Sequence, residues 1–304
     1  MTVANLDRIE GALFGTMIGD ALGRPFEGTP SADMPQLRAA VERRMQTPRA
    51  WGHSDDAEMM LALGDSLVAC DGVDEAHLLH TLSSQHDPAR GYGKGTRAAF
   101  RAWAETRSWQ LASRALWPEG SRGNGASVRV APVAAFYRES DAARVRAAAR
   151  RTAMPTHCHE EALAGAELMA LAIWHALAGT TAVSLASALR SHAIHDNFDE
   201  RLSHIDPVDD VSESVTKLGN DVFALASVPL AIWAHARNTT FEGAVLDAVS
   251  AAGDTDTIGA MTGAIAGATY GAKAMPKAWL AALETPGRRR AEKLAAALLL
   301  ASMS

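Results

Sequence analysis

Residues 253–271 read GDTDTIGAMTGAIAGATYG, and this stretch decides the fold that we expect. It opens on four oxygen-bearing side chains, those of Asp254, Thr255, Asp256 and Thr257, and glycines follow at 259, 263, 267 and 271. The apolar residues between the glycines predict a helix, whose free N–H groups and positive dipole end favour negative charge at its start. Two interpretations of that start stay open: an N-cap with solvated neighbours, or an anionic ligand site.

A second segment near the start of the chain repeats this glycine spacing. Residues 7–23 read DRIEGALFGTMIGDALG, with glycines at 11, 15, 19 and 23. Glycine inside a helix costs about 0.8–1 kcal/mol relative to alanine, and close backbone packing offsets that cost. We therefore expect both helices to be buried against near neighbours, or against each other, which brings Asp20 and Glu27 toward Asp254 and Asp256. Alternatively, Gly19 or Gly23 only ends the first helix.

A second acidic corner lies at Ser54, Asp55 and Asp56, directly before the helical pattern AEMMLALGDSLVA. If it meets the 254–257 corner and Glu27, five carboxylates share one site, and their mutual repulsion must be relieved. Bound divalent cations relieve it. Because every candidate ligand is an oxygen, Mg²⁺ or Mn²⁺ fits better than Zn²⁺, and the number of carboxylates indicates two ions.

Two glycine-containing corners are candidates for holding phosphate with backbone N–H groups. The first contains Gly91, Gly93 and Gly95, and the second runs RGNGASVR over residues 122–129. In the second, Arg122 and Ser127 beside exposed N–H groups would suit a diphosphate. Turn chemistry explains the first corner equally well, and a loop tied down by Asn124 explains the second.

The remaining pattern predicts an all-α fold, a single domain over residues 1–304 with its chemistry on loops at one end. We expect a helix that starts at Pro155 and Thr156, with His157 at that start as a ligand contact or a cap. Residues 190–215 resemble a polar connector, and 221–233 a buried helix. The segment at 28–53 is expected to overhang the site, and the loops at 28–53 and 104–122 are expected to choose the substrate.

Composition narrows the function classes. The net charge of −6 and the pI near 6.0 argue against a nucleic-acid-binding surface. Two cysteines in 304 residues form no disulfide framework or zinc motif, which indicates a reducing compartment and a cytoplasmic protein. The start of the chain is unlike a secretory signal, and no long uninterrupted apolar run predicts a membrane span.

Six motifs together resemble one known family. GALFGTMIGDALGRPFE, SDDAEMM, ARGYGKGT, GNGASVRVAP, THCHEEA and GDTDTIGAMTGAIAGATYG occur in this order between about residues 8 and 275. In this order they resemble the ADP-ribosylglycohydrolase family, which includes the dinitrogenase-reductase-activating glycohydrolase and the ADP-ribosylarginine and ADP-ribosylserine hydrolases. The resemblance implies an all-α fold with a binuclear Mg²⁺ or Mn²⁺ centre that hydrolyses the C1″ glycosidic bond of ADP-ribose on a modified side chain.

The resemblance also implies roles for individual residues. The metal ligands would be Glu27, Ser54, Asp55, Asp56, Asp254, Asp256 and Thr257. The ADP-ribose phosphates and riboses would be held by Gly91, Gly93, Gly95, Gly123, Asn124, Gly125, Ser127 and His157, and Phe223 would take the place of an adenine-stacking tyrosine. The family's frequent TDDT is SDDA here, which keeps a hydroxyl at Ser54 and loses one at Ala57, a position not expected to bind metal.

The mechanism that we expect is metal-assisted hydrolysis, in which the cations hold the ribose hydroxyls and acidify the attacking water. Glu27 is the candidate for a carboxylate that both contacts metal and moves a proton, while Asp55 and Asp256 hold the ions. The expected partners are ADP-ribose and an ADP-ribosylated protein, with arginine favoured as the modified side chain and serine possible. Two alternatives remain: a catalytically silent ADP-ribose-binding relative, and a binuclear-metal phosphoesterase that cuts the diphosphate.

Overall fold

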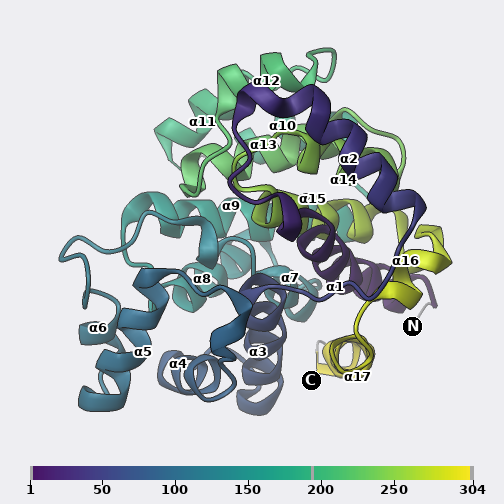
Figure 1. Ribbon diagram of the computed structural model, residues 1–304. Helices are drawn as coiled ribbons and strands as arrows, with labels where there is room; N and C mark the ends of the chain where they lie inside the picture. Colours follow the sequence, from purple (N-terminus) through teal and green to yellow (C-terminus); the bar gives the residue numbers. More distant parts are fainter. Residues whose placement is uncertain (1–2, 193–194, 302–304) are drawn as a thin grey trace.

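Two antiparallel helices form the centre of the molecule, α1 (Val3–Gly23) and α15 (Thr255–Tyr270), in the computed structural model of the chain. The structure describes residues 3–192 and 195–301. Figure 1 shows these two helices lying side by side although they come from opposite ends of the sequence. Because they run in opposite directions, the end of α1 meets the start of α15.

The glycines explain how closely these helices approach. A Cβ atom placed on Gly11, Gly15 or Gly19 would lie within about 2 Å of a backbone oxygen of α15, at Gly267, Gly263 and Gly259 respectively. No side chain fits there, so the two backbones are in direct contact and the glycine cost is offset by packing. The prediction of close packing from glycine spacing is confirmed, and the two helices are each other's neighbours.

The other helices surround this pair. In chain order they are α2 (Met34–Gln46), α3 (Asp55–Cys70), α4 (Glu75–Ser84), α5 (Lys94–Thr106), α6 (Trp109–Ala112), α7 (Ala131–Phe136), α8 (Ala142–Ala153), α9 (Glu160–Leu177), α10 (Ala182–Arg190), α11 (Asp196–Ser203), α12 (Val211–Leu218), α13 (Ala224–Ala236), α14 (Phe241–Ser250), α16 (Lys277–Ala282) and α17 (Thr285–Ala301). Helices α9, α13 and α14 pack on α15, while α17 and α7 pack on α1. One continuous apolar core results.

The all-α prediction is confirmed. Within residues 3–192 and 195–301 the only β-type pairings are three isolated bridges. One of them, Thr29 with Gly253, joins the segment after α1 to the segment before α15 through backbone hydrogen bonds of 2.8–2.9 Å. It fixes Glu27 and Asp254 on neighbouring strands of chain.

Three sequence-based boundaries were wrong. The helix expected from Pro155 begins at Glu160, with His159 as its N-cap, because the side chain of Thr156 is engaged with Arg129 and His157 instead of capping. The expected connector at 190–215 contains α11 and α12, each started by a side-chain cap. Phe223 is the N-cap residue of α13 and not part of the helix.

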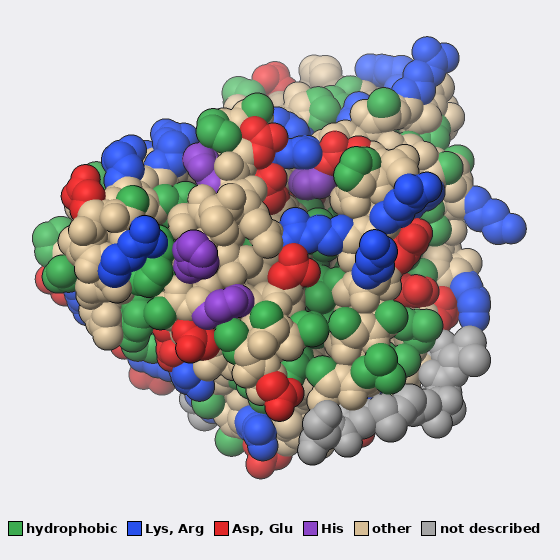
Figure 2. All heavy atoms as spheres, turned by 90° about the horizontal axis from the view of Figure 1, so that it is seen from below, with side chains coloured by type: hydrophobic (Ala, Val, Ile, Leu, Met, Phe, Trp, Pro, Cys, Tyr) green, Lys and Arg blue, Asp and Glu red, His purple; other side chains and the backbone are tan. Residues whose placement is uncertain are grey.

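Three further features describe the helices, the cysteines and one face of the surface. None of the helices in the described ranges is long and apolar enough to cross a membrane. The thiols of Cys70 and Cys158 are free. On the face drawn in Figure 2, Lys and Arg side chains are interspersed with Asp and Glu side chains, so that face offers no continuous basic patch to a polyanion.

Candidate active site

The acidic corner forms where α1 ends and α15 begins. Glu27 follows the 3-10 turn η1 (Arg24–Phe26), Asp254 precedes α15 and Asp256 lies in its first turn. One carboxylate oxygen from each of these three residues lies within 4.8 Å of the others. The hydroxyl of Thr255 donates to the carbonyl of Gly23 at 2.9 Å, which ties the two helix ends together.

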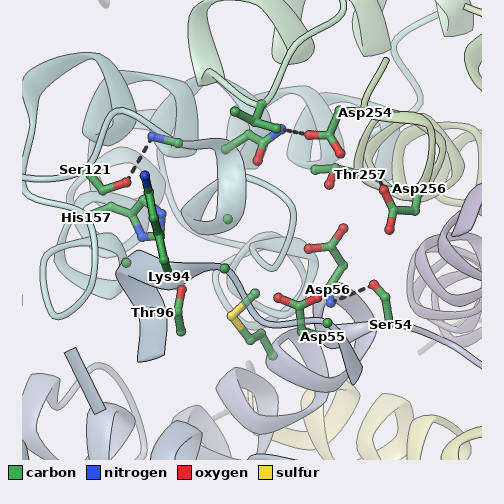
Figure 3. A pocket seen from close by; sticks show the side chains of 18 of the residues that line it. Ser54, Asp55, Asp56, Lys94, Thr96, Ser121, His157, Asp254, Asp256 and Thr257 are labelled. Carbon is green, nitrogen blue, oxygen red and sulfur yellow. Dashed lines mark hydrogen bonds between the residues drawn. The ribbon is translucent and has the colours of Figure 1, made fainter. Parts of the chain in front are cut away.

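The second acidic corner approaches the first from α3. The Oγ of Ser54 caps this helix by accepting from the backbone N–H of Asp56 at 3.1 Å. Asp20, fully buried on α1, accepts from the N–H groups of Ser54 at 2.8 Å and Ala57 at 3.1 Å. Asp20 therefore holds the start of α3 against α1. Figure 3 shows Asp55 and Asp56 pointing toward the space below Asp254 and Asp256.

The electrostatics of the corner favour a cation. Burial, reinforced by the charges of Asp20 and Glu27, raises the pKa of Asp55 to about 7. Burial and neighbouring carboxylates raise the pKa values of Asp56 and Asp256 well above the ordinary range. The Oδ2 atom of Asp56 is buried without a hydrogen-bond partner. An oxygen-only donor set with an unsatisfied buried carboxylate oxygen fits a hard divalent cation, and fits a thiophilic one poorly.

A cavity of about 750 Å³ extends from the acidic corners between the two glycine corners. Gly91, Gly93 and Gly95 line one wall, and Gly123, Asn124 and Gly125 line another. Gly91 has a φ of +103°, and a Cβ atom there would lie 3.7 Å from Oδ1 of Asp55, so the first glycine corner adjoins the carboxylates. The structure thus places both corners around one pocket.

Asn124 connects the second glycine corner to the acids. Its buried amide Nδ2 donates to Oδ2 of Asp254 at 2.6 Å and to the Oγ of Ser227 at 3.1 Å. The backbone N–H of Asn124 donates to the carbonyl of Val222, beside Phe223. One loop therefore contacts a candidate metal ligand and a residue of the pocket wall.

Aromatic rings and cations form the rim of the pocket. Phe223 is 46% exposed, with the guanidinium of Arg122 5.5 Å from its ring centroid. Trp117 is 37% exposed, with the ammonium of Lys94 5.7 Å from its ring. Both residues line the cavity, and each ring has a cation–π contact with a neighbouring basic side chain. Sequence reasoning named Phe223 but missed Trp117, a large aromatic residue in the irregular segment expected to choose the substrate.

Two expected placements differ from the structure. Ser127 is fully buried, its Oγ has no hydrogen-bond partner, and it is absent from the pocket lining because it points toward Gly165 of α9. The segment 28–53 contributes no lining residue, since α2 packs on α14 instead. Of the two segments expected to choose the substrate, only 104–122 reaches the pocket, through Trp117, Gly120, Ser121 and Arg122.

Two arginines that sequence reasoning passed over hold the second acidic corner in place. Nη1 of Arg24 and Nη1 of Arg90 both donate to the carbonyl oxygen of His53, at 2.7 and 2.8 Å. Nη2 of Arg24 also donates to the carbonyl of Ala89 at 3.1 Å. These bonds clamp the residue before Ser54 to the loop that carries the first glycine corner. The conspicuous acids hid this basic support from a reading of the motifs.

Comparison with known proteins agrees with this geometry. A sequence model of the ADP-ribosylglycohydrolase family matches residues 1–304. ADP-ribosylhydrolase ARH3 of Danio rerio is 32% identical over 93% of this chain and 88% of its own length, and ARH3 of Bos taurus is 31% identical over 90% and 88%. ADP-ribosylarginine hydrolase Tri1 of Pseudomonas putida is 30% identical over 90% of this chain and 74% of its own.

A solved structure shares the fold. A chain of an ADP-ribosylglycohydrolase-related protein complex superposes with a TM-score of 0.81 and 30% identity, over 99% of this chain and all of that one. The helical fold, the acidic corner and the family model over the full length lead to the same assignment. The chain belongs to the ADP-ribosylglycohydrolase family.

Proposed function

We propose that this protein is a Mg²⁺- or Mn²⁺-dependent hydrolase that removes ADP-ribose from a modified side chain by cleaving the C1″ glycosidic bond. The observation that carries the proposal is one 750 Å³ cavity with buried carboxylates at one end and two glycine corners along its walls. The acids suit cations and an oxocarbenium-like transition state, and the glycine backbone suits a diphosphate.

The proposed metal ligands are Glu27, Ser54, Asp55, Asp56, Asp254, Asp256 and Thr257, around two ions. Bound cations would supply Lewis-acid chemistry, lowering the pKa of a water and orienting the ribose hydroxyls. Glu27 is the proposed proton-moving group, because its side chain lines the cavity. Partial burial and the nearby charge of Asp254 raise the pKa of this carboxyl. Asp55 is the first residue of α3 and Asp256 the second residue of α15, and in this proposal both hold the ions.

The rest of the ligand would lie along the glycine corners. In this proposal backbone N–H groups around Gly91, Gly93, Gly95 and Gly125 bind the phosphate oxygens, which is supported by the position of these glycines in the cavity lining. The N–H of Gly123, which also lines the cavity, donates to the Oγ of Ser121 at 3.2 Å. In the same proposal the ring of Phe223 stacks on a flat base, which is supported by its exposure and its position in the cavity lining. We propose ADP-ribosylated arginine as the preferred substrate group, supported by the named specificity of the Pseudomonas relative, and serine as the second choice.

The test is product analysis on defined peptides that carry ADP-ribose on arginine or on serine. With Mg²⁺, we expect free ADP-ribose and the unmodified peptide, and the Asp256→Asn variant should release both at least about a hundredfold more slowly. Binding of ADP-ribose without turnover of either peptide would identify a silent relative. AMP together with a peptide that keeps ribose phosphate, separated by mass spectrometry, would identify a phosphoesterase.

A further inference from the structure

His157 presents one ring nitrogen to the pocket and the other to the protein interior. It lies in the turn between α8 and α9 and is buried. Cβ atoms built on Gly123 and Gly125 would lie 3.5 and 3.4 Å from Nε2, and all three residues line the cavity. Figure 3 shows the ring at the end of the pocket opposite Asp256. The atom Nδ1 lies 2.8 Å from Oγ1 of Thr156.

The direction of that inner hydrogen bond follows from the donors around it. Nη2 of Arg129 donates to Oγ1 of Thr156 at 2.8 Å, and a guanidinium can only donate. The Thr156 hydroxyl proton has two acceptors in reach: Nδ1 of His157 at 2.8 Å and the carbonyl of Ala153 at 3.5 Å. That carbonyl already accepts the backbone N–H groups of Thr156 at 3.1 Å and His157 at 2.9 Å.

A carbonyl oxygen with two short N–H donors has no lone pair left for a third donor at the limit of hydrogen-bond distance. The Thr156 hydroxyl therefore donates to Nδ1 of His157. A neutral imidazole that accepts at Nδ1 carries its proton on Nε2. We infer that Arg129 and Thr156 are positioning residues that fix His157 as the Nε2–H tautomer, so that the ring donates a hydrogen bond to an anionic oxygen of the ligand.

The surroundings of Arg129 support this role. Arg129 follows η4 (Asn124–Ala126) in the chain, its side chain is fully buried, and within the described ranges no carboxylate forms an ion pair with it. Its other Nη2 contact is the carbonyl of Thr152 at 2.8 Å. Burial, together with the charge of Arg129, lowers the pKa of His157 to about 3. The ring is thus neutral at physiological pH, and only its tautomer decides whether it donates or accepts at the pocket.

The assignment of the ligand oxygen to the ADP-ribose diphosphate rests on the proposed function, whereas the tautomer does not. ¹⁵N-detected NMR of the ligand-free protein tests the tautomer directly, because protonated and bare ring nitrogens have well-separated shifts. We expect the Nε2 of His157 to be the protonated nitrogen. A proton on Nδ1 would overturn the proposed positioning of His157 by Arg129 and Thr156, even in a protein that releases ADP-ribose. A proton on Nε2 in a protein without that activity would support the positioning of His157 and would defeat only the proposed function.

Substitutions of Thr156 test whether this residue positions His157 or has a purely structural role. Thr156→Val removes the hydroxyl at nearly constant volume, and Thr156→Ser keeps it. We expect Thr156→Val to reduce the Nε2–H population and to weaken ADP-ribose binding about tenfold, the worth of one hydrogen bond to a charged group. Thr156→Ser should restore both. Thr81→Val, at a buried threonine of α4, is the matched control and should change neither. Unchanged ring shifts in folded Thr156→Val would overturn the inference.

Discussion

At the scale of single residues, the buried carboxylates of the two acidic corners lower the stability of the folded chain. Asp56 and Asp256 are nearly inaccessible and lie among other acids, so burial and like charge raise both pKa values. Groups that function requires but that destabilise the fold are expected at binding sites, because a bound ligand offsets their repulsion. The corner is consistent with a chain whose full stability requires cations.

The Asp256→Asn variant separates the effect of this carboxylate on stability from its effect on ADP-ribose release. At pH 7 we expect the metal-free variant to be more stable than the metal-free wild type, since burial and neighbouring carboxylates raise the pKa of Asp256 and a neutral amide is not repelled by them. ADP-ribose release should fall at least about a hundredfold, because even groups behind metal ligands cost that much. Thermal unfolding in chelator and product analysis measure the two effects.

The exposed acid Asp33 provides the control for that substitution. Asp33→Asn removes one negative charge outside the corner and should leave both quantities unchanged. A metal-free Asp256→Asn protein that is less stable than wild type would contradict the view that these carboxylates repel one another.

Sequence reasoning at this scale grouped acids that the structure brings around one pocket, and their chemical roles stay predictions. Asp254, Asp256, Asp55 and Glu27 could be grouped because acids at helix starts need partners. Ser127 could not be placed, because which face of the segment after Asn124 meets the pocket depends on packing against Gly165 of α9. A hydroxyl in a motif is therefore a weaker indicator than a charge.

At the scale of elements, the close contact between α1 and α15 positions the site. The end of α1 delivers Asp20 and Glu27, and the start of α15 delivers Asp254 and Asp256. Because the glycine surfaces interlock at fixed spacing, a slide of one helix along the other would place side chains where only backbone fits. The register between the helices thus sets the register between the carboxylates.

Gly15→Ala tests that coupling. The new Cβ atom would lie 1.9 Å from the carbonyl oxygen of Gly263, a backbone atom that cannot move away cheaply. We expect a loss of about 3 kcal/mol in the free energy of unfolding, the upper part of the range for overpacked cores, and weaker Mg²⁺ binding in the protein that still folds. Chemical denaturation and calorimetry measure these.

Gly52→Ala is the matched control, since a Cβ atom there meets nothing within 4 Å and the backbone has no positive φ. It should leave stability and metal binding near wild type. If Gly15→Ala behaved like Gly52→Ala, the helices would not be held in register by their glycines.

Element boundaries were harder to predict than element identity. The spacing of four glycines predicted buried helices correctly because it repeats over about three turns in each. The start of α9 was misplaced because Pro155 and Thr156 have cap-like identities, yet the Thr156 hydroxyl is used by a tertiary contact with Arg129. Similarly, α11 and α12 are short polar helices whose capping signals stand among solvated acids.

At the scale of the whole molecule, buried neutral histidines make stability depend on acid. His235 on α13 is fully buried, and burial lowers its pKa to about 4 from an ordinary 6.5. Between these values the unfolded chain binds a proton that the folded chain does not, so stability is present above pH 6.5 and is lost as pH falls toward 4. The same direction holds for His157.

His235→Gln isolates this effect. Between pH 6.5 and 4 we expect the wild type to lose about 3 kcal/mol more unfolding free energy than the variant, the equivalent of about 2.5 pKa units. Urea denaturation at a series of pH values measures the difference. His80→Gln, at an exposed histidine, should parallel the wild type. Equal slopes for wild type and His235→Gln would show that His235 is protonated while folded.

The account as a whole depends on acids from distant parts of the sequence sharing cations at one end of the cavity. Anomalous diffraction from a Mn²⁺-soaked crystal tests this claim most directly. We predict two Mn²⁺ peaks, coordinated by carboxylate oxygens of Asp55 and Asp56 on one side and of Asp254 and Asp256 on the other. A crystal that shows no peak in this corner, from protein that still releases ADP-ribose, would contradict it.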